Sequence, residues 1–310
     1  MCAADRDDLV LWLTAADDRR GGQRYTLEER PLDVATMLAA QVWGRTRAVI
    51  ATSATLTTGE GPRGWDWIKG QLGAPAHAET LAVPSPFDFG RQALLCVTDG
   101  PSCRADGPGF ERHVAETLAS VVDAAQGRTL GLFTSHRVTQ ATRTALAGRV
   151  NPLLVQGDAP RSQLIARFRE DPAAVLLGTA SLWTGLDVQG EACVGVVIDK
   201  LPFPPPGEPV MAALCARAKR RTGDEWTGFR EELLPRAVLR LRQGAGRLIR
   251  TVEDWGLVVI CDGRLWSARY GPGVLRALGF PRVTRSLEEA TAWLRERLDT
   301  ELVAADGEVE

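Results

Sequence analysis

The stretch Thr129-Leu-Gly-Leu-Phe-Thr-Ser135 shows most plainly how this chain of 310 residues is organised. A short apolar run with strand character ends in two hydroxyl residues, and residues 137–147 follow with helical periodicity. The same order of a short strand and a longer helix recurs through residues 92–261. Such alternation predicts an α/β fold with a parallel sheet covered by helices on both faces.

The elements that we expect in this region alternate regularly. The predicted strands are 93–97, 129–133, 153–156, 174–177, 194–198 and 257–261, and the predicted helices are 110–125, 137–147, 160–170, 211–219 and 235–250. Open parallel sheets bind ligands at the carboxyl ends of their strands, so residues directly after a strand are the candidates for function.

The rest of the chain has a different character. Residues 9–14 and 48–53 predict strands, the second one buried, and residues 32–43 predict a helix. Residues 59–89 are rich in Gly, Pro and Trp, which is typical of a connection between domains. We therefore divide the chain into an N-terminal part at 1–58, a connection at 59–91, one α/β domain at 92–300 and an acidic tail at 301–310.

Composition limits the kind of partner and the kind of site. The net charge is only -2, so any contact with nucleic acid must come from local patches and not from the field of the whole surface. Six cysteines without a C-x-x-C pair, and only three histidines, argue against a metal site or a disulfide framework. An acidic start without an apolar core region, and no stretch long enough to span a membrane, favour the cytoplasm.

The predicted helix around Gln243 has two different faces. At 100° per residue, Arg236, Arg240, Gln243, Arg247 and Arg250 fall within an arc of roughly 80°. Apolar residues occupy the opposite side. The row of arginines is either a solvated basic face or a surface for phosphates, to which the planar guanidinium group can donate two parallel hydrogen bonds. Gly244 and Gly246 beside this row suggest that another group packs closely against the backbone.

Three strand ends carry small and hydroxyl residues, and each of them alone is typical of an ordinary capped turn. In order along the chain they read Thr52-Ser-Ala-Thr-Leu56, Leu132-Phe-Thr-Ser135 and Gly178-Thr-Ala-Ser-Leu-Trp-Thr-Gly-Leu-Asp187. Together with Gln243-Gly-Ala-Gly-Arg-Leu-Ile-Arg250, they resemble motifs III, IV, V and VI of superfamily 2 helicases in that order. Ser85-Pro-Phe-Asp-Phe89, Lys200-Leu-Pro-Phe203 and Asp262-Gly-Arg264 resemble the DinG/XPD branch of these helicases.

The resemblance, which runs from about Leu32 to Tyr270, implies a RecA-like fold, the second motor domain of an ATP-dependent DNA helicase, and a role in DNA repair. It implies ATP and Mg²⁺ as cofactors and single-stranded or forked DNA as the partner. The implied roles are catalysis for Arg247, Arg250 and Gln243, nucleotide binding for Gly185, Asp187 and Gly246, contact with DNA for Thr134, Ser135 and Thr179, and coupling between two lobes for Ser53 and Thr55. The resemblance also implies that residues 1–58 are a remnant of the first motor lobe with motif III.

The sequence departs from the resemblance in ways that bear on activity. It has no Gly-x-x-x-x-Gly-Lys-Ser/Thr and no Asp-Glu-x-His, so the parts that hold ATP and Mg²⁺ would belong to a front lobe, in cis or in trans. Thr184 and Trp255 stand where the family usually has charged residues. We therefore expect the chain to be inactive alone, and a nucleic-acid-binding module or a scaffolding pseudo-helicase remains the alternative.

Overall fold

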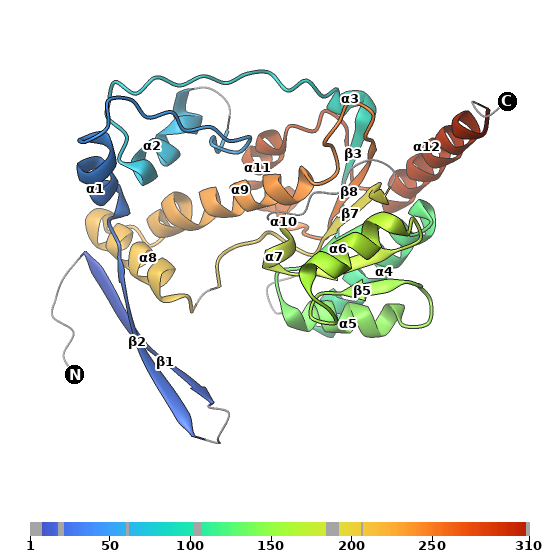
Figure 1. The fold of residues 1–310 in the computed structure, drawn as a ribbon, viewed down its shortest axis with the longest axis horizontal. Coiled ribbons are helices and arrows are strands. Elements are labelled where there is room, and N and C mark those ends of the chain that lie inside the picture. The colour runs from blue at the N-terminus through green and yellow to red at the C-terminus, as the bar shows by residue number, and fades with distance from the viewer. Residues whose placement is uncertain are drawn as a thin grey trace. The chain divides into compact units, whose positions relative to one another are not determined.

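The computed structural model describes residues 8–17, 22–59, 62–101, 107–183, 192–205 and 207–307 (Figure 1). The chain divides into two compact units, of which the first comprises Met1–Ala82 with Phe203–Leu239 and the second Val83–Pro202 with Arg240–Glu310. The predicted continuous domain at 92–300 differs from this division, because residues 203–239 leave the second unit and group with the N-terminal part of the chain.

The second unit is built on a seven-stranded sheet. The strands are β3 (Ala93–Val97), β4 (Thr129–Leu132), β5 (Leu153–Val155), β6 (Val175–Gly178), β7 (Gly195–Ile198), β8 (Gly256–Ile260) and β9 (Val283–Thr284). Their order is β5-β6-β4-β7-β8-β3-β9, and every neighbouring pair is parallel. This confirms the predicted α/β class, although the two residues of β9 are too short a run to predict.

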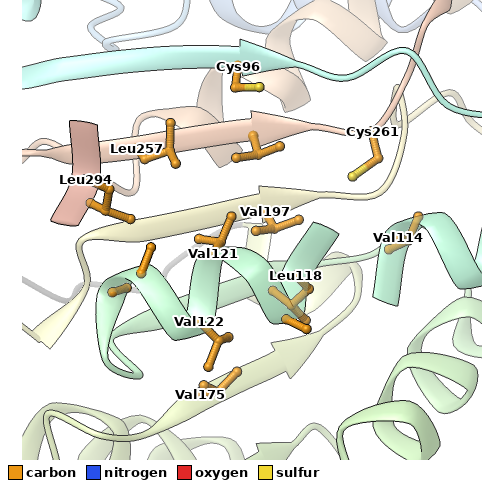
Figure 2. Close-up of a cluster of buried hydrophobic side chains, with 14 of the residues drawn as sticks. Cys96, Val114, Leu118, Val121, Val122, Val175, Val197, Leu257, Cys261 and Leu294 are labelled. Atoms are coloured by element: carbon orange, nitrogen blue, oxygen red, sulfur yellow. The ribbon is translucent and has the colours of Figure 1, made fainter. Parts of the chain in front are cut away.

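Helices surround this sheet. They are α3 (Phe89–Gln92), α4 (Pro108–Ala125), α5 (His136–Leu146), α6 (Arg161–Glu170), α7 (Ala180–Trp183), α10 (Arg264–Ser267), α11 (Gly271–Leu278) and α12 (Leu287–Gly307). Figure 2 shows Val121 and Val122 of α4 and Leu294 of α12 among the strand residues of the core. Cys96 and Cys261 lie in the same core, where burial raises the pKa of each thiol to about 12. Both side chains therefore pack as small hydrophobic residues.

The first unit contains a β-hairpin and short helices. Strands β1 (Leu9–Asp17) and β2 (Gln23–Pro31) pair antiparallel, and α1 (Val34–Leu38) continues as a wider helical turn over Ala39–Trp43. It also contains a short helical turn (Pro62–Trp65), α2 (Asp66–Leu72), α8 (Pro209–Thr222), a second wide turn (Phe229–Leu233) and the first part of α9 (Leu234–Ala245), up to Leu239. The strand at 9–14 is confirmed as part of β1, but β2 was not predicted.

The predicted buried strand at 48–53 is wrong for this structure. These residues form no strand, and Ile50 is 87% exposed. A buried strand needs neighbours that satisfy both of its edges, and the first unit has only the two strands of the hairpin among its described residues. The composition of 48–53 is still that of a core strand. The local sequence therefore favours a strand, but its described surroundings offer no sheet in which it could pair.

Helix α9 (Leu234–Ala245) carries the first part of the predicted arginine row. The apolar side is buried as predicted, and its members are Ala237, Val238, Leu241, Ala245, Leu248 and Ile249. The helix ends at Ala245, however, so Arg247 and Arg250 lie beyond it and a spacing of 100° per residue does not place them. Arg236 pairs with Glu232 and Gln71 and stacks over Trp67, so it is not a solvated residue.

Candidate functional site

The carboxyl end of β4 is joined to that of β7 by a buried carboxylate. Asp199, directly after β7, accepts the backbone N–H of Thr134 at 3.0 Å from each carboxylate oxygen and the Thr134 hydroxyl at 2.9 Å. It also accepts the backbone N–H of Lys200 at 2.7 Å. Burial raises the pKa of Asp199 to about 7, although these hydrogen bonds and the nearby Lys200 charge act to lower it. The carboxylate therefore fixes Thr134, and the sequence prediction missed it.

Ser135 has a structural task of its own. Its side-chain oxygen accepts the backbone N–H of Val138 at 3.4 Å, so Ser135 is the N-cap of α5. The strand end and the start of the helix are thus arranged as in the capped turn that the sequence allowed as one interpretation. A cap still leaves the hydroxyl hydrogen of Ser135 available for another acceptor.

Thr179 lies at the end of β6, the neighbour of β4. Its backbone N–H donates to Gln156 Oε1 at 2.8 Å, and its hydroxyl oxygen is 3.4 Å from the same atom. Gln156 follows β5, so one amide side chain ties the ends of two adjacent strands together. Thr179 is only 9% exposed, and the sequence gave no separate signal for Gln156.

Trp183 connects three of the singled-out segments. Its indole Nε1–H donates to the carbonyl of Phe133 at 3.2 Å, and its own carbonyl accepts from Arg247 Nε at 3.1 Å and Nη2 at 2.8 Å. A Cβ atom added to Gly244 would lie 2.8 Å from the Trp183 ring. Gly244 is thus the glycine at which another group approaches the backbone closely, as the sequence suggested, whereas Gly246 is exposed.

The loop after Arg250 is held from two sides. Asp254 is 4% exposed, and its carboxylate accepts the backbone N–H groups of Arg250 at 2.6 Å and Thr251 at 2.7 Å. The side-chain amide of Gln92 donates to the carbonyls of Thr251, Val252 and Asp254 at 3.0, 3.1 and 2.8 Å. Both partners were absent from the predicted site.

Trp255, at a position where the resemblance led us to expect Arg, belongs to the hydrophobic core and is 5% exposed. The guanidinium carbon of Arg297 lies 5.7 Å from the centre of its ring. The departure at this position is therefore accommodated by packing.

A third buried carboxylate lies just after β8. Asp262 accepts the backbone N–H of Leu201 at 2.8 Å and the guanidinium group of Arg264 at 2.8 and 2.6 Å. Burial acts to raise the pKa of Asp262, but the hydrogen bonds and the charge of Arg264 outweigh it and the net pKa is lowered. The Lys200–Phe203 and Asp262–Arg264 segments, which the sequence singled out separately, therefore meet at Leu201.

Among the remaining predicted site residues, Gly185 and Asp187 fall outside the described residues, as does Thr184. Gln243 is half-buried on α9. Ser53 and Thr55 belong to the first unit, where their side-chain oxygens lie 3.4 Å apart and the Thr55 N–H donates to Ser53 Oγ at 3.1 Å. The second unit contains Thr134, Ser135, Thr179, Arg247 and Arg250, and within it Trp183 contacts both Arg247 and Phe133, the residue before Thr134.

Two further observations concern ligands and membranes. Within the described ranges, no three side chains of His, Cys, Asp or Glu come together in a way that could hold a metal ion. In the same part of the chain, no helix has both the length and the apolar character that a membrane crossing requires.

The fold and these segments define a RecA-like helicase lobe. A family model described as "Helicase C-terminal domain" matches residues 118–279, and the chain therefore belongs to this family, in agreement with the resemblance to the DinG/XPD branch. The Xpd4 structure of S. tokodaii shares the fold, with a TM-score of 0.55 and 14% identity over 85% of this chain and 50% of that one.

Two relatives show how far the similarity extends. The ATP-dependent helicase DinG of Mycobacterium tuberculosis is 40% identical over 271 residues, which cover 86% of this chain and 39% of the relative. The ATP-dependent DNA helicase YoaA of Escherichia coli is 37% identical over 273 residues, covering 88% and 42%. The chain thus spans about two fifths of the length of these relatives.

Proposed function

We propose that this chain is the second motor domain of an ATP-dependent DNA helicase and couples ATP hydrolysis to movement along single-stranded DNA. The observation that carries the proposal is the chain of contacts from Arg247 through Trp183 to Phe133, which links motif VI to motifs V and IV. Coupling needs such a connection, because the nucleotide and the DNA act on different motifs.

The DNA contacts of the proposal lie at the ends of two adjacent strands. Thr134 and Ser135 follow β4, and Thr179 follows β6, with Leu132 and Gly178 paired in register. Hydroxyl and backbone N–H groups at strand ends can donate to phosphate oxygens. The contacts are local, which agrees with a net charge of only -2. We propose single-stranded or forked DNA as the partner and DNA repair as the process.

The ATP site would be formed by residues of this chain together with residues of a front lobe. Arg247 and Arg250 are the residues of this chain that would stabilise the negative charge on the γ-phosphate, with Gln243 close to them in sequence. Mg²⁺, when bound, would neutralise charge on the phosphates, and its protein ligands would come from the front lobe, since this sequence has no phosphate loop and no Asp-Glu-x-His. We propose that the front lobe acts in cis or in trans, in the cytoplasm.

A second candidate is a nucleic-acid-binding module or pseudo-helicase without catalysis. The absence of a phosphate loop from the sequence favours it for the chain by itself. The proximity of the motif V and VI segments favours the motor, because a module that only binds DNA has no need of arginines held beside motif V.

Steady-state ATP hydrolysis distinguishes the two. The chain alone, with single-stranded DNA, is expected to show no turnover, whereas the chain fused to or co-expressed with the front lobe of a DinG-type relative is expected to show DNA-stimulated turnover. Turnover by the rigorously purified chain alone would overturn the assignment of the ATP site to a front lobe. An assembled pair that binds DNA and never hydrolyses ATP would favour the module.

A further inference from the structure

The side chain of Trp183 is almost fully enclosed, with only 4% of the residue exposed. It comes at the end of α7, whose four residues begin just after the carboxyl end of β6. Because α7 is so short, the position of the indole ring depends on the residues that pack against it. Trp183 makes three contacts, one to the segment after β4 and two to the end of α9 and the residues that follow it.

The first contact is to the segment that follows β4. The Trp183 indole N–H donates to the Phe133 carbonyl, whose residue directly precedes Thr134. The Phe133 backbone N–H in turn donates to the carbonyl of Gly178 at 2.8 Å, one residue before Thr179. A displacement of Thr134 or Thr179 by a bound phosphate is therefore transmitted to the carbonyl that the indole holds.

The second and third contacts are to the end of α9. The Trp183 ring lies against the Cα side of Gly244, where a methyl group would stand 2.8 Å from two ring carbons and 3.3 Å from a methyl of Leu132. The Trp183 carbonyl accepts two hydrogen bonds from the Arg247 guanidinium group. Because both donors meet this one oxygen atom, a movement of the Trp183 carbonyl changes the position at which the guanidinium group is held.

We propose that Trp183 is the positioning residue through which DNA bound at motif IV sets the position of Arg247. The inference deepens the proposed function and rests on it, because it takes the hydroxyl segment after β4 as the contact with DNA. The ring packs against Gly244 and has no free space on the α9 side. Its indole N–H is bound to Phe133, and the backbone carbonyl of Trp183 is bound to Arg247, so a movement of the side chain acts on both segments.

The test uses the whole chain and an oligothymidylate of roughly twenty nucleotides, long enough for several strand contacts. NMR follows three signals as the DNA is added: the Thr134 amide, the Trp183 indole N–H and the Arg247 Nε–H. In the wild-type chain all three are expected to shift and to saturate at one DNA concentration. In Trp183→Phe, which keeps a ring but removes the donor to Phe133, the Thr134 signal should still shift and the Arg247 response should be largely lost.

Gly244→Ala provides an independent variant, because it keeps the indole N–H and displaces the ring. It is expected to reduce the Arg247 response as well, with the Thr134 response retained. Gly273→Ala is the matched control, since a methyl group at Gly273 in α11 meets no atom within 4 Å, and it should leave all three responses unchanged. A residue that only stabilised the fold would change all responses together or none.

The outcomes separate this inference from the function on which it rests. DNA binding with no shift at Arg247 in the wild type, or an equal shift in Trp183→Phe and Gly244→Ala, overturns the role of Trp183 and leaves the DNA-binding motor intact. If the oligothymidylate shifts none of the three signals, the DNA contact at motif IV is wrong and the inference fails with it.

Discussion

The carboxylate of Asp199 accepts both the backbone N–H and the hydroxyl of Thr134, so the first predicted DNA contact is held by a buried acid. The raised pKa of Asp199 means that the folded chain binds this proton more tightly than the unfolded chain does. Stability contributed by this group is therefore lost as pH rises from about 4 towards 7. Ionisation is unfavourable because burial removes the carboxylate from water.

Replacing Asp199 by Asn should remove this pH dependence. Between pH 5 and pH 8 the free energy of unfolding of the wild type should fall relative to that of Asp199→Asn, by on the order of 2 kcal/mol. Urea unfolding at several pH values measures this difference. Asp262→Asn is the matched control: the pKa of Asp262 is lowered, so the group is ionised in both states over this range and its difference from wild type should stay constant. Equal slopes for both variants would contradict the prediction.

Gln92 should matter through the loop that follows Arg250. Gln92→Ala leaves three carbonyls without the donor that they share, and we expect a loss of roughly 1–3 kcal/mol of stability. Hydrogen exchange of the Arg250 and Thr251 amides should become faster, since the Asp254 carboxylate that binds them sits in the same loop. Gln140, which is exposed on α5, gives the control variant Gln140→Ala. Unchanged exchange at Arg250 would show that Asp254 alone orders the loop.

The exposed segment at 48–53 leads to a prediction about assembly. Ile50→Asp should leave the melting temperature of the chain nearly unchanged, because the side chain is already 87% exposed. It should weaken association with a front lobe, where burying an Ile side chain is worth roughly 1.5–3 kcal/mol. Pull-down or calorimetric titration against the front lobe measures this, with Val83→Asp as a control at another exposed apolar residue. Wild-type affinity in Ile50→Asp would refute the prediction that this segment takes part in binding a front lobe.

The sequence predicted the parallel sheet well, because each strand from β3 to β8 is a short apolar run followed by a helix. It failed where structure depends on distant partners. Residues 48–53 have the composition of a strand but no described sheet to join, and β2 alternates too weakly to be recognised. The end of α9 at Ala245 was missed because Gly244 and Gly246 were interpreted as close-packing positions within a longer helix.

In the candidate site, too, some residues could be predicted from the sequence and others could not. Thr134, Ser135, Thr179, Arg247 and Arg250 were found from motifs, and their roles stay predictions. The residues that hold them, Asp199, Gln156, Gln92 and Asp254, were not found, because a buried polar side chain is recognised only by its partners. Asp199 did offer a signal, since it is a charged residue directly after an apolar strand.

The arginines provide the sharpest test of the motor. In the chain assembled with a front lobe, Arg247→Ala or Arg250→Ala should reduce DNA-stimulated ATP turnover by roughly 10³ or more, the low end for an arginine that stabilises the transferred phosphate. Affinity for single-stranded DNA should change little. Arg276→Ala, at an exposed position on α11, is the control and should leave turnover unchanged.

The hydroxyl residues should behave in the opposite way. Thr179→Val and Ser135→Ala should weaken DNA binding at fixed salt, and turnover at saturating DNA should be largely kept. Ser135→Ala also removes the N-cap of α5, at a cost of about 1 kcal/mol in stability, so affinity has to be measured well below its melting temperature. If Arg247→Ala instead weakens DNA binding and flattens its salt dependence while turnover persists, the arginines line a DNA surface. The assignment of motif VI to the nucleotide would then be wrong.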